Sequence, residues 1–313
     1  MRYYFAPMEG LTDSIYRRLH HKYFPGIDRY YTPFFSPTIH RHLTPREERE
    51  LPFANTLDFP VVPQVLTKVP EDFLWMAAVC KDRGYAEVNL NLGCPSGTVT
   101  AKGKGAGMLA DPEGLDRFLD RIFSSCVLPI SVKTRLGLAT PEEFVQLLEI
   151  FNRYPICELT IHPRVRKQFY NGDVDMQAFS YAVENSRIPL CYNGNLCSKD
   201  DAKVFAKAYP QVQSVMVGRA LIGDPGMLTG GTNLVALERF CDELLEEYTV
   251  AFGGARNAMF RLKENWRHIL CMFEGSEKLG KRLRKTTDLG EFKAITKEIF
   301  RTLPLRKKLQ PDG

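Results

Sequence analysis

Residues 87–134 begin with EVNLNLGCPS at Glu87–Ser96, continue through PEGLDRFLDRIFS at Pro112–Ser124 and end with PISVKT at Pro129–Thr134. The two outer runs are short and apolar, as buried strands are. The middle stretch has the apolar period of an amphipathic helix, and Asp111 precedes it as a residue that caps helix N-termini. This part of the chain therefore predicts a strand, a helix and a second strand.

The same alternation extends outward in both directions along the chain. We expect strands at Tyr3–Pro7, Arg29–Phe34, Val61–Leu66, Glu87–Leu92, Pro129–Thr134, Cys157–His162, Pro189–Asn193 and Val212–Val217. We expect helices at Thr12–Lys22, Glu71–Arg83, Pro112–Ser124, Pro141–Tyr154, Asp175–Glu184 and Lys199–Ala208. The exception is Ser36–Pro60, where prolines and charges with a weak apolar period predict an irregular excursion.

This pattern predicts an α/β protein with a (β/α)₈ TIM barrel. A doubly wound sheet fits less well, because no G-x-G-x-x-G follows the first strand. After Gly230 the strand signals stop, and helices are expected at Leu234–Phe252, Asn257–Phe273, Ser276–Lys285 and Leu289–Arg301. We therefore predict a barrel domain at residues 1–230 and a small all-helical C-terminal domain at residues 231–313.

The composition of the chain excludes several classes of protein. Its 313 residues are 44% hydrophobic and 25% charged, which excludes disorder and fibrous repeats. The longest apolar stretches, such as Phe73–Cys80, are too short to cross a membrane, and the N-terminus lacks the features of a signal peptide, so we expect a cytoplasmic protein with no membrane contact. The eight cysteines form no C-x-x-C, so neither a metal site nor a disulfide framework is expected.

Positive charge is concentrated near the C-terminus. The net charge is +5 (42 minus 37), but Lys278–Lys308 alone holds eleven Lys and Arg against three acidic residues. Such a segment is typical of a surface that binds a polyanion. The alternative is an ordinary solvated helix face.

Polar side chains gather where the predicted strands end. The carboxyl ends of barrel strands carry the active site in this fold, and a β-strand places Lys133 and Arg135 on one face. The alternatives are ion pairs of these two cations with Glu87 or Glu158, a core role for His162, and loop hydrogen bonds for the asparagines. Because such side chains occur at several successive strand ends, we favour a ligand site that includes Gln64, Asn91, Lys133, Arg135 and His162.

Glycines follow the last two predicted strands, at Asn193-Gly194-Asn195 and Gly218-Arg219. In many barrels these two loops hold a phosphate. Taken singly, an Asn-Gly pair is a turn signal, but both sites together favour a cofactor that carries a phosphate. A ring over the barrel mouth facing Lys133, with its phosphate at these loops, matches the geometry of FMN.

Cys94 stands at a strand end before a loop rich in glycine and lysine, Thr100–Gly107. Most cysteines are small buried hydrophobes. A position at the barrel mouth beside flanking charge instead favours a chemically active thiol, and the mobile loop is expected to act as a lid.

These residues resemble the tRNA-dihydrouridine synthase family. The resemblance runs through A-P-M-x-G-x-T-D at Ala6–Asp13, N-x-G-C-P at Asn91–Pro95 and V-K-x-R-x-G at Val132–Gly137, together with His162 and the two glycine sites. It implies that NADPH reduces FMN, that flavin N5 delivers hydride to uracil C6, and that Cys94 protonates C5. It also implies FMN contacts from Ala6, Pro7, Met8, Gln64, Asn91, Lys133, His162, Asn193, Gly194, Asn195, Gly218 and Arg219.

The resemblance further implies that the substrate is tRNA. Arg135 and Tyr170 match positions that face the uracil in that family, and Pro163 and Phe169 stand where glycines are common. We expect the basic C-terminal segment to contact tRNA phosphates through Lys281, Arg282, Arg284 and Lys285, and we expect a monomer. The alternatives are another FMN barrel acting on a small molecule, such as a dihydroorotate dehydrogenase or ene-reductase relative, and a tRNA-binding protein without the activity. The sequence does not indicate which uridine is modified.

Overall fold

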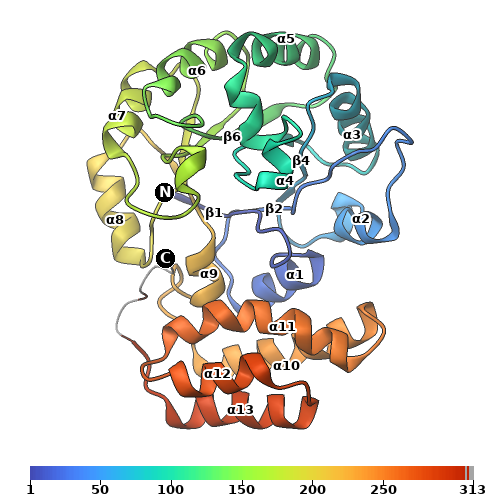
Figure 1. Ribbon diagram of the computed structural model, residues 1–313, viewed down its shortest axis with the longest axis vertical. Coiled ribbons are helices and arrows are strands. Elements are labelled where there is room, and N and C mark those ends of the chain that lie inside the picture. The colour runs from blue at the N-terminus through green and yellow to red at the C-terminus, as the bar shows by residue number, and fades with distance from the viewer. Residues whose placement is uncertain (307–308, 310–313) are drawn as a thin grey trace.

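The computed structural model describes residues 1–306 and 309, and it contains a barrel of parallel strands with helices around it (Figure 1). The strand order is β3-β2-β1-β9-β8-β7-β6-β5-β4. The strands are β1 (Arg2–Phe5), β2 (Arg29–Tyr31), β3 (Val61–Val62), β4 (Gln64–Val65), β5 (Val88–Leu92), β6 (Ile130–Arg135), β7 (Leu159–His162), β8 (Leu190–Tyr192) and β9 (Ser214–Val217).

The barrel closes through a strand that is broken at one residue. β3 pairs with β2 and β4 pairs with β5, while Pro63 separates the two halves. Proline has no backbone N–H to donate to a neighbouring strand, but the Pro63 carbonyl still accepts from the Asn89 N–H at 2.8 Å. β3 and β4 therefore occupy the one position predicted at Val61–Leu66, and the predicted TIM barrel is confirmed.

Six of the helices around the barrel were predicted from the sequence, and the short α9 was not. In α5, for example, Leu115, Phe118, Leu119 and Ile122 are buried, and the Asp111 side chain caps the helix by accepting from the Gly114 N–H. This spacing of three and four residues places one apolar face against the strands. The set comprises α1 (Ser14–Tyr23), α3 (Pro70–Asp82), α5 (Pro112–Phe123), α6 (Glu143–Phe151), α7 (Met176–Asn185), α8 (Lys199–Ala208) and the short α9 (Arg219–Gly223).

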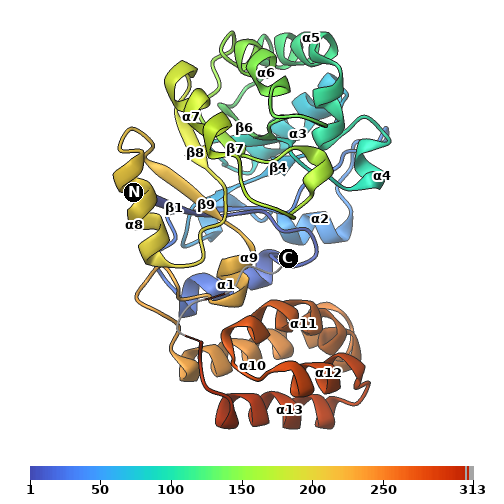
Figure 2. The same cartoon turned by 60° about the vertical axis from the view of Figure 1, so that its left-hand side comes forward.

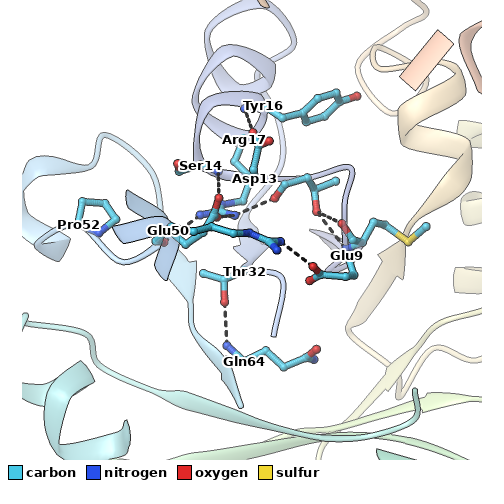
Figure 3. A network of polar contacts seen from close by, with 12 residues as sticks. Glu9, Asp13, Ser14, Tyr16, Arg17, Thr32, Glu50, Pro52 and Gln64 are labelled. Carbon is cyan, nitrogen blue, oxygen red and sulfur yellow. Dashed lines mark hydrogen bonds and ion pairs between the residues drawn. The ribbon is translucent and has the colours of Figure 1, made fainter. Parts of the chain in front are cut away.

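The predicted irregular excursion contains a helix that the sequence analysis missed. α2 (Pro45–Glu50) begins with a capping box between Thr44 and Glu47. Its sequence PREERE has no apolar period, so periodicity could not reveal it. The helix is held by Glu50, which pairs with Arg17 of α1 at 3.0 Å and accepts from the Ser14 N–H at 3.2 Å (Figure 3).

The C-terminal part is helical and packs below the barrel in Figures 1 and 2. It consists of α10 (Leu234–Ala251), α11 (Ala255–Ile269), α12 (Glu277–Lys285) and α13 (Leu289–Thr302). α10 packs against α1, and α11 packs against α9. The domain boundary at Gly230 stays a prediction. Lys307 and Lys308 of the basic segment, and the predicted domain end at residues 310–313, lie outside the described residues.

Three global features follow from the described part of the chain. All eight cysteines are free thiols. Within residues 1–306 and 309, no helix combines the length and the apolar character needed to cross a bilayer. Over the same residues, no group of three or more His, Cys, Asp or Glu side chains could hold a metal ion.

Candidate active site

A cavity of about 230 Å³ opens at the carboxyl ends of the barrel strands. The loops that line it follow strands far apart in the sequence, because all the strands of the barrel are parallel. The structure brings together here every barrel residue that the sequence singled out: Ala6, Pro7, Met8, Gln64, Asn91, Cys94, Lys133, Arg135, His162, Tyr170, Asn193, Gly194, Asn195, Gly218 and Arg219.

Buried amide side chains form a ladder across the floor of the cavity. Asn91 donates to the Gln64 Oε1 at 2.7 Å, and Gln64 donates to the Asn89 Oδ1 at 2.8 Å. The Asn91 Oδ1 also accepts from the backbone N–H groups of Gly93 and Cys94, at 3.0 and 2.9 Å. Asn91 therefore fixes the turn that carries Cys94, in keeping with the loop role that the sequence analysis left open for the asparagines.

Lys133 and Arg135 lie on the inner face of β6, as their spacing predicted. The alternative of ion pairs with the two glutamates is wrong, because Glu87 pairs with Arg29 at 2.8 Å and Glu158 with Arg2 at 3.6 Å. Burial, and secondarily the charge of Arg135, lower the pKa of Lys133 to about 8. A negative charge bound beside Lys133 would be strongly stabilised.

The guanidinium of Arg135 holds the surrounding backbone. Its Nε donates to the Gly93 carbonyl at 2.9 Å, and its Nη1 donates to the Val165 carbonyl at 3.2 Å. Burial lowers the pKa of Arg135 to about 10, which leaves it charged at neutral pH. Because Gly93 precedes Cys94, Arg135 helps to fix the position of the thiol.

His162 is neutral and its protonation pattern is set by Arg164. The Arg164 Nη1 lies 2.9 Å from the His162 Nε2, and both side chains are buried. An arginine can only donate, so the Nε2 accepts and the ring proton lies on Nδ1. Burial, and then the charges of Arg135 and Lys133, hold the pKa of His162 well below its usual range.

Cys94 is half-buried at the edge of the cavity. Burial raises the pKa of its thiol, although Arg135 and Lys133 act in the opposite direction, so Cys94 is protonated at neutral pH. The predicted lid folds into two short helices, α4 (Gly97–Thr100) and η2 (Gly105–Ala110). The Ala106 N–H donates to the Cys94 carbonyl at 3.1 Å, and the Lys104 Nζ donates to the Ser36 Oγ at 3.1 Å, so this segment packs directly against the cysteine.

Tyr170 lies over the cavity between two arginines. The guanidinium carbons of Arg219 and Arg135 are 4.7 and 5.4 Å from its ring centre. The preceding residue, Phe169, has a φ of 51°, a conformation that favours glycine. Tyr170 therefore lines the cavity although Phe169 before it is in a strained conformation, and its contact with the uracil stays a prediction.

Two glycines that line the cavity leave little room for a side chain, and Gly194 leaves none unless Tyr192 moves. A Cβ at Gly194 would lie 1.9 Å from the Tyr192 hydroxyl, and a Cβ at Gly218 would lie 3.2 Å from the Met8 sulfur. These close approaches explain why glycine follows both strands.

The cavity wall is strongly cationic. Lys133, Arg135, Arg164 and Arg219 line it, and Glu9 is the single carboxylate among its described lining residues. That carboxylate is itself paired with Arg46 at 2.6 Å. The site therefore suits an anionic ligand.

The family model described as dihydrouridine synthase (Dus) matches residues 4–302, a span that contains all of these site residues. The chain belongs to the dihydrouridine synthase family. It is therefore an enzyme, as the resemblance implied, and the alternatives of another flavin barrel and of an inactive tRNA-binding protein are not supported.

Named relatives of this dihydrouridine synthase cover most of the chain. The tRNA-dihydrouridine(16) synthase of Shigella flexneri is 30% identical over 240 residues, covering 72% of this chain and 74% of the relative. The tRNA-dihydrouridine synthase B of Pasteurella multocida (strain Pm70) is 24% identical over 278 residues, covering 88% and 80%.

A solved structure supports the fold of this dihydrouridine synthase. A morphinone reductase mutant in complex with tetrahydroNAD aligns with a TM-score of 0.52 and 10% identity, covering 76% of this chain and 86% of that chain. At this identity the similarity concerns the fold alone.

The predicted site and the observed cavity differ in two respects. The basic residues Lys281, Arg282, Arg284 and Lys285 of α12 are exposed and do not line the cavity. Conversely, the sequence analysis did not assign Arg164 to the site of this dihydrouridine synthase. Arg164 lies beyond the end of β7, so the strand spacing that pointed to Lys133 and Arg135 did not apply to it.

Proposed function

We propose that this protein reduces a uridine of tRNA to 5,6-dihydrouridine, with FMN as cofactor and NADPH as reductant. The observation that carries the proposal is the cationic cavity at the barrel mouth with a protonated cysteine at its edge. Such a cavity suits both the phosphate of a flavin nucleotide and the carbonyl oxygens of a uracil.

The residues present fit FMN. Lys133 and the neutral His162 would face the polar edge of the ring, and Ala6, Pro7 and Met8 supply a wall on the β1 side. Arg219, with the backbone at Gly194 and Gly218, would hold the phosphate, because glycines allow N–H groups to approach its oxygens closely. The remaining FMN contacts in this proposal are Gln64, Asn91, Asn193 and Asn195.

The chain would supply a binding site for the uracil and one proton. Arg135 and Tyr170 would hold the base against the cofactor, and their mutual stacking fixes their relative orientation. Bound FMN would supply the hydride at C6 after its reduction by NADPH. The Cys94 thiol would give its proton to C5, a role that requires the protonated form, which burial favours.

Recognition of the rest of the tRNA is assigned to the helical part. Leu279, Gly280 and Leu283 form the buried face of α12, so Lys281 and Arg284 point outward. Arg282 is paired with Glu298 of α13 at 3.2 Å, which reduces its net positive charge. Lys281, Arg284 and Lys285 would therefore supply most of the attraction of α12 to phosphates.

The experiment is a two-step redox assay on purified protein loaded with FMN. NADPH should bleach the flavin in the absence of oxygen, and unmodified tRNA should then restore its colour. Free uracil or orotate in place of tRNA should not, and an ene-reductase substrate such as an α,β-unsaturated ketone should not. Mass-spectrometric mapping of the tRNA would then locate the dihydrouridine. Reoxidation by a small molecule but not by tRNA would contradict the proposal.

A further inference from the structure

A second, smaller cavity of about 60 Å³ adjoins the main one. Gly194, Asn195, Gly218 and Arg219 line both cavities, so the two lie on either side of the loops after β8 and β9. Three of them, Gly194, Gly218 and Arg219, are the residues assigned above to the cofactor phosphate. The smaller cavity has about a quarter of the volume of the main one, so it suits a small group and not a flavin ring.

The helical part forms the opposite wall of this smaller cavity. His268 of α11, together with Cys271 and Leu309, lines it. α11 reaches this position because it lies against α9, whose Gly223 allows a close approach (Figure 1). A Cβ on Gly223 would lie 3.2 Å from the backbone carbonyl oxygen of His268, so the lack of a side chain at Gly223 leaves room for α11 to lie this close to α9.

The chemistry of the smaller cavity favours an anion. Arg219 comes from the barrel and His268 from the helical part, and the described lining residues include no carboxylate. Arginine and histidine, with the N–H groups of a glycine-containing loop, are typical ligands of phosphate oxygens. Two parts of the chain that are far apart in sequence thus present donors to one small space.

We propose that the helical part supplies a ligand, His268, to the phosphate of the cofactor, so that cofactor binding and the docking of the helical part stabilise each other. This inference rests on the proposed use of FMN. Coupling between two equilibria is reciprocal. If docking of the helical part strengthens FMN binding through His268, bound FMN stabilises the docked arrangement by the same free energy. The helical part, with the basic face proposed to bind tRNA, would therefore be docked most stably when FMN is bound.

The test compares the affinities of FMN and riboflavin, which differ by the phosphate alone. Flavin fluorescence quenching would be titrated with the wild type, His268→Ala and His268→Gln, and with Arg267→Ala as a control at the exposed neighbouring position. We expect His268→Ala to weaken FMN binding about tenfold or more, the usual effect of losing one hydrogen bond to a charged group. Riboflavin binding should not change, and Arg267→Ala should match the wild type.

Other outcomes would overturn the inference in distinguishable ways. An unchanged FMN affinity in His268→Ala, or an equal loss of FMN and riboflavin affinity, would remove His268 as a phosphate ligand while leaving the proposed function intact. A wild-type protein that binds neither flavin would overturn the proposed function itself.

Hydrogen exchange provides a second measurement that does not depend on a variant. FMN should slow amide exchange in α11 and α9 of the wild type more than saturating riboflavin does, because riboflavin lacks the phosphate that would join the two parts. Equal protection by the two flavins would contradict the coupling.

Discussion

Cys94 combines a position at the cavity edge with a protonated thiol. Cys94→Ala should retain the yellow colour of bound flavin and its bleaching by NADPH, because neither needs a proton from this residue. Turnover with tRNA should fall by about 10²–10⁴-fold, the usual contribution of a general acid. Single-turnover reoxidation of the reduced enzyme by tRNA measures this step. Unimpaired reoxidation would exclude Cys94 as the proton donor.

Lys133 should make the flavin a better electron acceptor below about pH 8. Its lowered pKa of about 8 means that it is charged at pH 7 and largely neutral at pH 9.5. Charged Lys133 stabilises the negative charge of the reduced ring, so Lys133→Met should lower the midpoint potential at pH 7 by about 30–60 mV. As pH rises above about 8, wild-type Lys133 loses its proton, so the difference in midpoint potential between the wild type and Lys133→Met should shrink.

Spectroelectrochemical titration at pH 7 and pH 9.5 would measure this difference. Lys102→Met serves as the matched control, because it removes the same charge from an exposed position in the lid segment. Equal potentials for the wild type and Lys133→Met at pH 7 would place Lys133 away from the ring.

Individual site residues could be predicted where the parallel barrel alone determines their position, that is, at the carboxyl ends of its strands. Lys133 and His162 follow from strand ends alone, because β6 and β7 pair in register and bring their ends to one level. The partner of His162 could not be predicted in this way. Arg164 lies beyond the end of β7, and its contact with His162 depends on the path of the loop through Pro163.

Helix α12 presents its basic residues on the face opposite its buried leucines. Arg284→Glu should weaken tRNA binding and reduce the slope of log K against log[salt] by about one or more, because a phosphate contact is lost and a repulsion gained. Filter binding at several salt concentrations measures both quantities. Lys207→Glu, the same change on exposed α8 of the barrel, should leave the slope unchanged. Equal effects of Arg284→Glu and Lys207→Glu on the slope would indicate that tRNA binding depends on the total charge of the protein and not on α12.

For most elements with a strong apolar period, the first and last residues were predicted to within one to three residues. α2, which has no such period, was not predicted. α8 has the predicted bounds Lys199–Ala208, and α5 ends one residue earlier than predicted. The predicted helix Asn257–Phe273 instead begins at Ala255 and continues past Ile269 as a 3₁₀ turn, since local hydrogen bonding and not periodicity decides where a helix ends. α2 depends on caps and on Glu50 reaching Arg17, a contact that only the folded chain creates.

The barrel and the helical part are joined by a second contact on the α1 side. The Asp13 carboxylate caps α1 by accepting from the Tyr16 N–H at 3.0 Å (Figure 3). It also accepts from the Tyr248 hydroxyl of α10 at 3.0 Å and from the Arg261 Nη2 of α11 at 2.8 Å. The aspartate that ends the first sequence motif therefore positions the helical part. Under the proposed function, the orientation of that part relative to the cavity would decide which uridine of a tRNA can reach Cys94.

Asp13→Ala should lower the free energy of unfolding of the helical part by about 3 kcal/mol, since it leaves the largely buried Arg261 without its carboxylate. Arg261→Met should cost less, and the double variant should cost about 1–3 kcal/mol less than the sum of the two, because the contact is lost only once. The chain has two tryptophans, Trp75 in α3 and Trp266 in α11. In a Trp75→Phe background, fluorescence during urea unfolding would therefore report the helical part selectively. Strictly additive losses would show that Asp13 and Arg261 act independently, and the ion pair between them would then not hold the helical part in place.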